Sequence, residues 1–535
     1  MNKVAQYLQE HLDGEVTDQL SLRRYFSTDA SILTLTPSVI AFPRHENDIR
    51  KVARFSWQLA ERGQSLPLTV RGGGTDTSGA AIGSGAILVT TKHLNKIIDL
   101  DPKQHQVIVQ PGLKYGALQQ TLETHGFSLP VAPNSAAKAT IGGGVANNAL
   151  GNQSVKYGST QDYVKSLRVV LANGEAIETG PLGKRELSQK LGLANFEGQL
   201  YRTLDTLLEE NAKLISEARA KVKARHSAFA YNLFGVKQAG QFDITPLFVG
   251  AQGSLGIITE ASLHLETHNP QVSLAMVSLE SLEDLRLVLP KIHELNPSSI
   301  ELVNRETFQM VNQINPAFIR DFRKLSGWAI HLFVEFDNFK ASDQERLVKN
   351  LKKITEKVGG DFKVASNEES YLEIDKLRQA VNILLHEAQG QKHAVPMLDG
   401  ISVPPDQVVD FIQHASQIHH SVDLLPAIWG PVGSGVIMIS PSLNIGEVGD
   451  RQKLFKLADG LFEKAVELGG SASAAGDGRV RASYTNSTLG KEMAALMGQV
   501  KQLFDPHNIL NPGVKSLTLD EMKTLIRDEY SLNLV

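Results

Sequence analysis

The most informative loop of this chain reads Arg71-Gly72-Gly73-Gly74-Thr75-Asp76-Thr77-Ser78-Gly79 and directly follows the apolar run 66–70, which predicts a buried strand. Three consecutive glycines allow the backbone to approach a ligand closely and to point successive N–H groups into one concavity that suits an anion. The hydroxyl groups of Thr75, Thr77 and Ser78 add further donors. An isolated glycine run can also be a plain turn, so its meaning depends on the rest of the chain.

A second glycine-rich segment reads Thr140-Ile141-Gly142-Gly143-Gly144-Val145-Ala146-Asn147-Asn148-Ala149-Leu150-Gly151, with Pro133-Asn134-Ser135 before it and Lys156-Tyr157-Gly158 after it. Two separate segments rich in glycine and in hydroxyl or amide side chains fit a ligand with two ends and a charged middle, which is the shape of a dinucleotide such as FAD. The first loop is not a G-x-G-x-x-G fingerprint, because Thr77 stands where the third glycine belongs. A Rossmann dinucleotide site is therefore excluded.

The amino-acid composition limits which partners the protein can bind and how electrons could leave it. The 535 residues contain 54 Lys plus Arg and 58 Asp plus Glu, and this net charge of −4 gives no basic stripe for nucleic acid. The absence of cysteine excludes a cysteine-held iron–sulfur cluster in this sequence. Electrons carried by a bound cofactor would have to leave to a quinone, an electron-carrier protein or oxygen.

The sequence contains no obvious membrane or export segment. No stretch approaches the ~18–20 consecutive apolar residues of a transmembrane helix, and the N-terminus lacks an apolar core of the signal-peptide type. We therefore expect a cytoplasmic protein, with peripheral membrane contact left open.

A third segment, Gly250 to Glu260, again places glycines before a predicted strand. The three segments, in this order, resemble the FAD-binding domain of the vanillyl-alcohol-oxidase / p-cresol-methylhydroxylase superfamily, and the most similar branch contains the D-lactate, glycolate and D-2-hydroxyglutarate dehydrogenases. The stretch Phe504 to Gly513 resembles the closing motif of the second domain in that branch. Residues 402–404 and 300–302 match weaker internal motifs.

The resemblance implies an α+β fold, with a p-cresol-methylhydroxylase-type FAD-binding domain of two subdomains followed by an α+β substrate domain on an antiparallel sheet. We expect a helical lead over residues 1–34 and the FAD-binding domain over 35–268. A Lys-, Glu- and Leu-rich stretch, about 182–240, is interpreted as a helical insertion in that domain. The substrate domain is expected over 269–515, with a charged tail over 516–535.

The family also implies how the loops hold FAD. Residues 72–76 would wrap the pyrophosphate with backbone N–H groups, and residues 140–143 would close over the same phosphates. In covalent members a histidine follows the first glycines and bonds the flavin, whereas this chain has Thr75, so we expect FAD to be held non-covalently. The complete expected cofactor-binding set is Arg71, Gly72, Gly73, Gly74, Thr75, Asp76, Ser78, Gly79, Pro133, Asn134, Thr140, Gly142, Gly143, Asn147, Gly151, Tyr157, Gly158, Gly253, Gly256 and Ile258.

The chain departs from this branch at the reacting centre. Many members have a G-H-x-G-x-G-N-x-H motif and an S-G-E-H-G motif, which supply histidines for a metal and for the substrate. Here Pro431 and Met438 stand at the two histidine positions, and the stretch 469–479 has no Glu-His pair. Neither side chain can accept a proton or bind a hard cation, so we expect no divalent metal site.

Replacement groups must come from elsewhere in the chain. Arg378 stands where the branch places an arginine that grips the substrate carboxylate, a task that suits a planar guanidinium, although a helix-surface arginine is the simpler alternative. His393, near Asp399, is a candidate base, and Asn511 would face the flavin, with a structural turn before Pro512 as its alternative. Weaker candidates are His331, Glu335, Asp477 and Tyr484.

Three functions fit these observations. The leading hypothesis is an FAD-dependent dehydrogenase or oxidase, similar to D-lactate dehydrogenases, that transfers hydride from a small 2-hydroxy acid or alcohol to FAD. The missing histidines motivate an alternative in which the protein binds flavin but serves as a binding or assembly subunit. A non-redox transferase on the same scaffold is the third.

Overall fold

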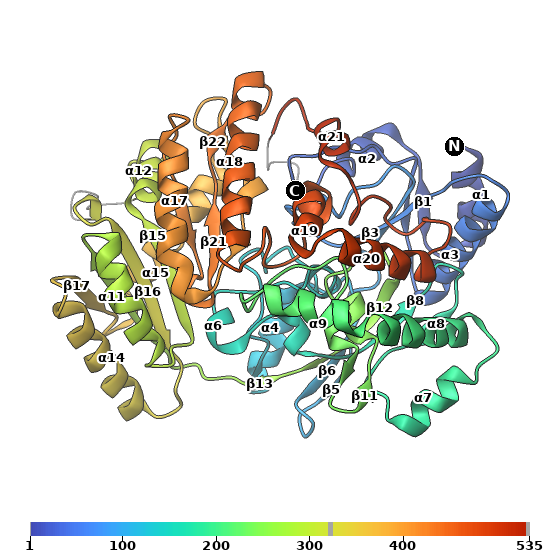
Figure 1. Cartoon of the computed structure of the whole chain (residues 1–535), viewed down its shortest axis with the longest axis horizontal. Coiled ribbons are helices and arrows are strands. Elements are labelled where there is room, and N and C mark those ends of the chain that lie inside the picture. Colours follow the sequence, from blue (N-terminus) through green and yellow to red (C-terminus); the bar gives the residue numbers. More distant parts are fainter. Residues whose placement is uncertain (1, 319–324, 531–535) are drawn as a thin grey trace.

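Three β-sheets, each with its own helices, organise the protein, whose computed structural model describes residues 2–318 and 325–530. The first two sheets belong to the N-terminal half, and the third and largest lies at the opposite end of the molecule (Figure 1). Two mixed subdomains followed by a domain on an antiparallel sheet confirm the expected α+β fold class.

The first sheet has the strand order β1-β2-β4-β3. Strands β2 and β3 both run parallel to β4, and most of the apolar residues of the three strands are buried, as expected for strands covered on both faces. β1 pairs antiparallel with β2, so the expected helical lead over 1–34 is wrong in part, because it also supplies an edge strand. The elements are α1 (Lys3–His11), β1 (Glu15–Thr17), α2 (Leu20–Tyr25), β2 (Val39–Phe42), α3 (Glu46–Glu61), β3 (Leu68–Arg71) and β4 (Ala86–Val89).

The second sheet is antiparallel, with the order β5-β6-β12-β8-β9. Its strands are β5 (Ile97–Asp101), β6 (Gln106–Val109), β8 (Val164–Val170), β9 (Ala176–Glu178) and β12 (Ile257–His264). The surrounding elements are α4 (Tyr115–Thr124), α5 (Ile141–Asn147), α6 (Ser154–Tyr157), η1 (Thr160–Asp162), α7 (Lys184–Leu191), α8 (Phe196–Glu210), α9 (Ala212–Lys221), η2 (Leu233–Gly235) and α10 (Thr245–Phe248), with the small pairs β7 (Phe127–Ser128) with β13 (Glu266–Thr267) and β10 (Lys237–Gln238) with β11 (Gln241–Phe242). Helices α7 to α9 fall within the stretch expected to be a helical insertion.

The third sheet is also antiparallel, with the order β17-β14-β16-β15-β20-β21-β19. Its strands are β14 (Ser273–Leu279), β15 (Ser299–Asn304), β16 (Ile330–Phe336), β17 (Asp361–Val364), β19 (Ile401–Ser402), β20 (Ile428–Gly430) and β21 (Val436–Ile439). The other elements are α11 (Leu282–His293), α12 (Arg305–Ile314), α14 (Ala341–Glu356), α15 (Glu368–Arg378), α16 (Val381–His386), β18 (His393–Ala394), η3 (Pro396–Leu398), η4 (Pro405–Gln407), α17 (Val408–His420), η5 (Val432–Ser434), β22 (Ser442–Leu443) and α18 (Val448–Glu467).

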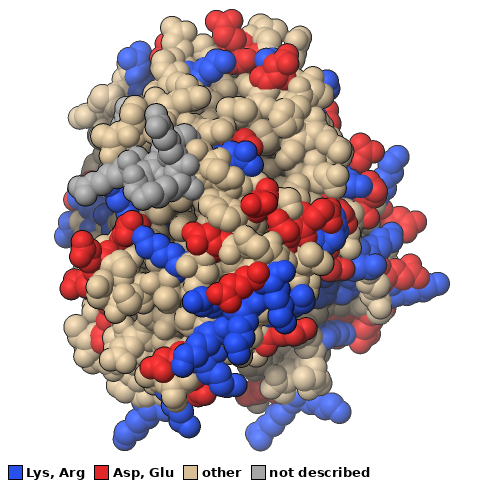
Figure 2. All heavy atoms as spheres, turned by 90° about the vertical axis from the view of Figure 1, so that its left-hand side faces the viewer, with Lys and Arg blue, Asp and Glu red and all other residues tan. Residues whose placement is uncertain are grey.

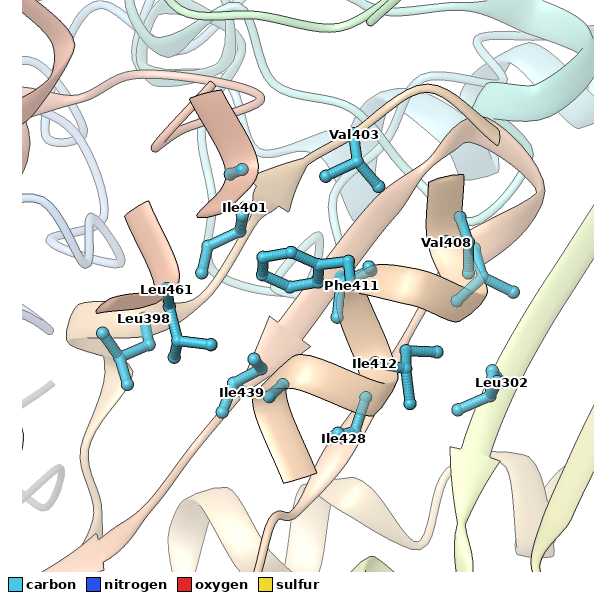
Figure 3. Packing of buried hydrophobic residues seen from close by; sticks show 14 of the residues in the cluster. Leu302, Leu398, Ile401, Val403, Val408, Phe411, Ile412, Ile428, Ile439 and Leu461 are labelled. Atoms are coloured by element: carbon cyan, nitrogen blue, oxygen red, sulfur yellow. The ribbon is translucent and has the colours of Figure 1, made fainter. Parts of the chain in front are cut away.

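A large apolar core holds the third sheet to its helices. Phe411 and Ile412 of α17 lie against Ile428 and Ile439 of the sheet, and Leu461 of α18 closes the same cluster (Figure 3). Every one of these side chains is buried. This packed sheet holds the loops between β19 and β21 close to the N-terminal half.

The C-terminal part of the chain returns to the N-terminal half. The helices there are α19 (Gly478–Leu489), α20 (Lys491–Phe504) and α21 (Leu519–Lys523). α20 buries Met493 and Phe504 in the core of the second subdomain, and Leu68 N donates a hydrogen bond to Ile509 O at 2.7 Å, beside β3. The expected boundaries therefore do not separate the two cores, since the end of the segment 269–515 packs into the first domain.

The tail beyond residue 515 is also integrated. Arg527 and Tyr530 are buried, and the Tyr530 hydroxyl donates to Ala30 O at 2.9 Å. At the end of the molecule that carries α14, Lys and Arg side chains gather in a band with acidic side chains between them (Figure 2). Among residues 2–318 and 325–530, no helix combines the length and the apolar character needed to cross a bilayer.

Replacing Phe504 with alanine tests whether α20 belongs to the core of the second subdomain. The Phe504 ring packs edge-on against Phe248, with ring centroids 5.7 Å apart. We expect Phe504→Ala to lower the free energy of unfolding by about 3–5 kcal/mol, because a cavity replaces the ring. Denaturant unfolding measures this. Gly498→Ala, on the same helix and with open space at the new Cβ, is the control and should be neutral or slightly stabilising.

Candidate functional site

A cavity of about 640 Å³ is lined by residues of both the N-terminal half and the second domain. Residues 72–77 and the loop around Thr140 form one side of it, so the two glycine-rich segments meet in space as expected. The opposite wall comes from the second domain and includes Trp429, Met438 and Arg481. Tyr530 from the tail completes that wall.

The first glycines are required by contact between the two loops themselves. A Cβ atom at Gly72 would lie 2.2 Å from Thr140 Oγ1, and one at Gly73 would lie 2.1 Å from Lys138 O. Gly74 adopts φ +73°, a left-handed conformation that favours glycine. The loops therefore touch backbone to backbone, which is a stronger constraint than the ligand approach that the sequence suggested.

The same loops present backbone donors to the cavity. Within the described part of the chain, no hydrogen bond engages the N–H groups of residues 72–77. Buried N–H groups need an acceptor, and Gly74 is buried. Gly253, at φ +74°, also faces open space from the third glycine segment. These donors fit a diphosphate, so the residues present fit FAD.

Polar side chains fix the loops to one another. The Asp76 carboxylate accepts from Ala80 N at 2.7 Å and from Asn147 Nδ2 at 2.9 Å. Gln252 donates to Asn147 Oδ1 at 2.7 Å and to Ser78 Oγ at 2.8 Å. Gln252 lines the cavity and was not predicted, although it lies inside the third glycine segment that drew attention in the sequence.

The structure places most of the expected cofactor residues on the cavity. Those that line it are Gly72, Gly73, Gly74, Thr75, Asp76, Pro133, Asn134, Thr140, Gly142, Gly143, Asn147, Gly151, Gly253, Gly256 and Ile258. Arg71, Ser78, Gly79, Tyr157 and Gly158 are not among them. Arg71 is buried beneath the loop and donates to Thr28 O at 2.6 Å, while Tyr157 donates to Asp337 at a neighbouring cavity.

Asn511 is not among the residues that line the cavity, so its expected contact with the flavin stays a prediction that this geometry does not support. Its amide nitrogen donates to Ala80 O at 2.9 Å and to Gln252 O at 2.7 Å. Its amide oxygen accepts from Arg479 at 2.8 Å and from the Thr69 hydroxyl at 3.2 Å. Because both the nitrogen and the oxygen of its amide are hydrogen-bonded within the protein, Asn511 connects three loops and has no free donor or acceptor for a ligand.

Arg378 is also not among the residues that line this cavity, and its expected grip on the substrate carboxylate stays a prediction. It lies on a separate cavity of about 480 Å³, which shares Asn134 with the first. Three carboxylates surround its guanidinium, with Asp375 at 2.5 Å, Glu335 at 3.4 Å and Glu301 at 3.5 Å. Burial raises the pKa of Glu301 to about 7. The negative charges of these carboxylates therefore compensate the positive charge of Arg378 within the protein.

The other candidate bases do not line the cavity. His393 is half-buried, with its ring 6.0 Å from that of Tyr530, and its assignment as the catalytic base stays a prediction that the lining of this cavity does not support. His331 is buried in the third sheet and pairs with Ser278 Oγ at 3.0 Å. Asp477 forms a buried ion pair with Lys515, and Tyr484 donates to Asp459 at 2.7 Å. Glu335 belongs to the Arg378 cluster.

The positions where the branch places its histidines do line the cavity. Pro431 and Met438 stand on its wall, and so do Ala474 and Ala475 from the stretch without a Glu-His pair. The chemistry is therefore altered at the site itself. Among the described residues, one group brings three metal-ligating side chains together, namely Asp13, His45 and Asp48, and it does not line this cavity.

Two ionisable groups on this wall escaped the sequence argument because no motif marks them. Asp399 is partly exposed, lines the cavity and accepts from Ser440 Oγ at 2.8 Å. Arg481, from α19, is buried and donates to the Asp399 carbonyl oxygen. Desolvation raises the pKa of Asp399 to about 7 and lowers that of Arg481. Trp429 Nε1 and Arg481 Nε find no partner among the described residues.

The chain matches two known families. Residues 37–180 match the family described as FAD binding domain, and residues 268–514 match FAD linked oxidases, C-terminal domain. The first match contains both glycine-rich loops, and the second contains Asp399 and Arg481.

Curated relatives align with nearly the whole chain. It is 28% identical over 537 residues to the D-2-hydroxyglutarate dehydrogenase of Escherichia coli K12, which covers 96% of this chain and 51% of that protein. It is 26% identical over 461 residues to the D-lactate dehydrogenase of Anaerostipes hadrus, covering 84% of each. The chain spans about half the length of the D-2-hydroxyglutarate dehydrogenases it matches.

A solved structure shares the fold. The crystal structure of p-cresol methylhydroxylase with bound substrate superposes with a TM-score of 0.68 at 16% identity, covering 97% of both chains.

Substituting Gly73 tests the contact between the loops. The new Cβ in Gly73→Ala would overlap the Lys138 carbonyl oxygen at 2.1 Å, so the loops must separate and the N–H groups lose their common direction. We expect FAD affinity to fall at least about tenfold, equivalent to about 1.4 kcal/mol. Titration of the apoprotein with FAD measures this, with Gly449→Ala as the matched control, since its Cβ meets nothing. Equal affinity of both variants would contradict the role given to Gly73.

Asn511→Ala tests the structural role of that side chain. Its removal leaves Ala80 O and Gln252 O without this donor and takes away one of the three acceptors of Arg479. We expect the free energy of unfolding to fall by about 2 kcal/mol or more, measured by denaturant unfolding of the apoprotein. Undiminished stability combined with loss of substrate oxidation would instead support a catalytic role.

Proposed function

Because the chain belongs to the vanillyl-alcohol-oxidase / p-cresol-methylhydroxylase superfamily of FAD-linked oxidoreductases, we propose that it is an FAD-dependent dehydrogenase of small 2-hydroxy acids such as D-lactate. The observation that carries this proposal is the single cavity that runs from the glycine loops to the second-domain wall. Relatives named as D-2-hydroxyglutarate and D-lactate dehydrogenases support the substrate class.

Different residues along the cavity would bind the cofactor and surround the reacting carbon. The backbone N–H groups of residues 72–77, which have no acceptor among the described residues, would hold the diphosphate of FAD, and Ile258 would lie beside the adenosine half. Bound FAD supplies the acceptor for the hydride that the substrate loses. Trp429, Pro431 and Met438 give the second-domain wall an apolar character that keeps water from the reacting carbon.

The alternative of a flavin-binding assembly subunit rests on the missing histidines. Against it, the cavity keeps a carboxylate and a guanidinium, Asp399 and Arg481, on the wall where those histidines are replaced. Ionisable groups with shifted pKa values gather at functional sites, and both groups have shifted pKa values, which favours catalysis. Electrons would leave to a quinone, an electron-carrier protein or oxygen, because this sequence has no cysteine to hold an iron–sulfur cluster.

Anaerobic mixing of the holoprotein with hydroxy acids tests the activity. We expect D-lactate, D-2-hydroxyglutarate or glycolate to bleach the visible flavin band, with L-lactate as the stereochemical control. An unchanged spectrum with every acid, in a preparation that holds FAD, would count against the dehydrogenase.

Acid precipitation tests how the cofactor is held. Thr75 lines the cavity at the position where covalent members have histidine, and a threonine hydroxyl does not form that bond. We expect the yellow colour to leave with the supernatant. A yellow pellet would indicate a covalent link through another residue.

A further inference from the structure

The cavity has few ionisable side chains free to act on a substrate. Among the described residues, those that line it are Asp76, Lys138, His386, Asp399, Arg481 and Tyr530. Asp76 is occupied by the loop, and the Tyr530 hydroxyl donates to Ala30 O. Lys138 and His386 are exposed at the surface. Asp399 and Arg481 remain.

Asp399 lies where the branch's histidines are replaced. The next residue, Gly400, accepts a hydrogen bond from Ala474 N at 2.7 Å and lies against Met438, whose Sδ would be 3.9 Å from a Cβ at Gly400. The Asp399–Gly400 segment therefore contacts both altered stretches. Ser440 Oγ donates to the Asp399 carboxylate at 2.8 Å, and a carboxylate has about four acceptor positions, so it can also receive a substrate hydroxyl.

Arg481 has unused donors beside Asp399. Its two terminal nitrogens donate to Asp399 O and, at 3.4 Å, to Gly476 O, whereas Nε has no partner among the described residues. Trp429 Nε1 on the same wall is likewise buried without a partner in the described chain. Buried donors without acceptors are costly. A carboxylate bound at this wall would bring acceptors that such donors lack.

We propose that Arg481, assisted by Trp429, binds the substrate carboxylate and that Asp399 accepts the proton of the substrate hydroxyl, in place of the missing histidines. The O–H bond breaks as its proton passes to Asp399, and the C–H bond breaks as its hydrogen leaves with two electrons for FAD. A C=O bond forms, so the 2-hydroxy acid is oxidised to a 2-oxo acid while FAD is reduced. This inference rests on the proposed function.

Charged and polar groups around Asp399 determine its pKa. Arg481 lies on α19, Ser440 follows β21, and Tyr530 comes from the tail. The Asp477–Lys515 pair and Asp76 act on Arg481 from farther away. Because desolvation raises the pKa of Asp399 to about 7, the ionised base is present above that pH and is lost below it.

The Asp399→Asn variant tests the proton acceptor. In the FAD-loaded protein we expect anaerobic flavin reduction by D-lactate to slow about 100-fold or more, in the usual range for loss of a general base. We also expect the rise of the wild-type rate through about pH 7 to disappear. Asp406→Asn, at an exposed aspartate outside the cavity, is the matched control. Retention of both the rate and the pH profile in Asp399→Asn would overturn the proposal.

Ser440→Ala provides a second test that keeps the carboxylate. Loss of the hydroxyl donor destabilises the ionised form of Asp399, so the midpoint of the pH–rate profile should move upward. This shift stays measurable even if Asp399→Asn fails to fold. An unmoved midpoint would argue against Asp399 as the titrating base.

Oxalate, a planar carboxylate that cannot be oxidised by hydride loss, tests Arg481 without turnover. We expect oxalate to perturb the flavin spectrum of the wild-type protein and to bind about tenfold or more weakly to Arg481→Met, with Arg481→Lys intermediate. Equal affinity in all three would overturn the anion-binding role. If no hydroxy acid reduces the wild-type flavin, the proposed function and the proton-transfer role both fail, and the oxalate titration still decides the role of Arg481.

Discussion

Backbone contact between two glycine-rich loops is the constraint on which the rest of this structure depends. Gly72 and Gly73 pack so tightly on Thr140 and Lys138 that no side chain could be accommodated between them. The N–H groups of residues 72–77 have no acceptor among the described residues, and all six residues line one cavity. An anion-binding cradle therefore arises from two segments that are far apart in the sequence, without a helix-terminal fingerprint.

The second domain completes the site because the chain comes back to the first. Helix α20 lies in the core of the second subdomain, and Asn511 joins loops that include Ala80 and Gln252. Arg479, which lies on α19, also donates a hydrogen bond to Asn511. The two halves therefore share a continuous packed and hydrogen-bonded boundary, and the wall that carries Asp399 and Arg481 is held in register with the glycine loops.

The altered wall shows how one scaffold can change its chemistry. Pro431, Met438, Ala474 and Ala475 replace groups that could bind a metal or move a proton, and all four face the cavity. Such replacements leave apolar side chains that neither carry charge nor bind a metal. The buried guanidinium of Arg481 and the carboxylate of Asp399 are the ionisable groups that remain on this wall. We therefore expect any activity of this chain to depend on them.

The sequence by itself determined the α+β class, the two glycine loops, the FAD-binding assignment and the loss of the family histidines. These are properties of local backbone freedom and of residue identity, which can be read along the chain. Only the tertiary structure decided which polar side chains are available to a ligand. Asn511 is consumed by a carbonyl 431 residues away in the chain, and Arg378 by a carboxylate 43 residues away, whereas Asp399 faces the cavity. The availability of a side chain depends on partners brought together by folding, and no pattern along the chain reports them.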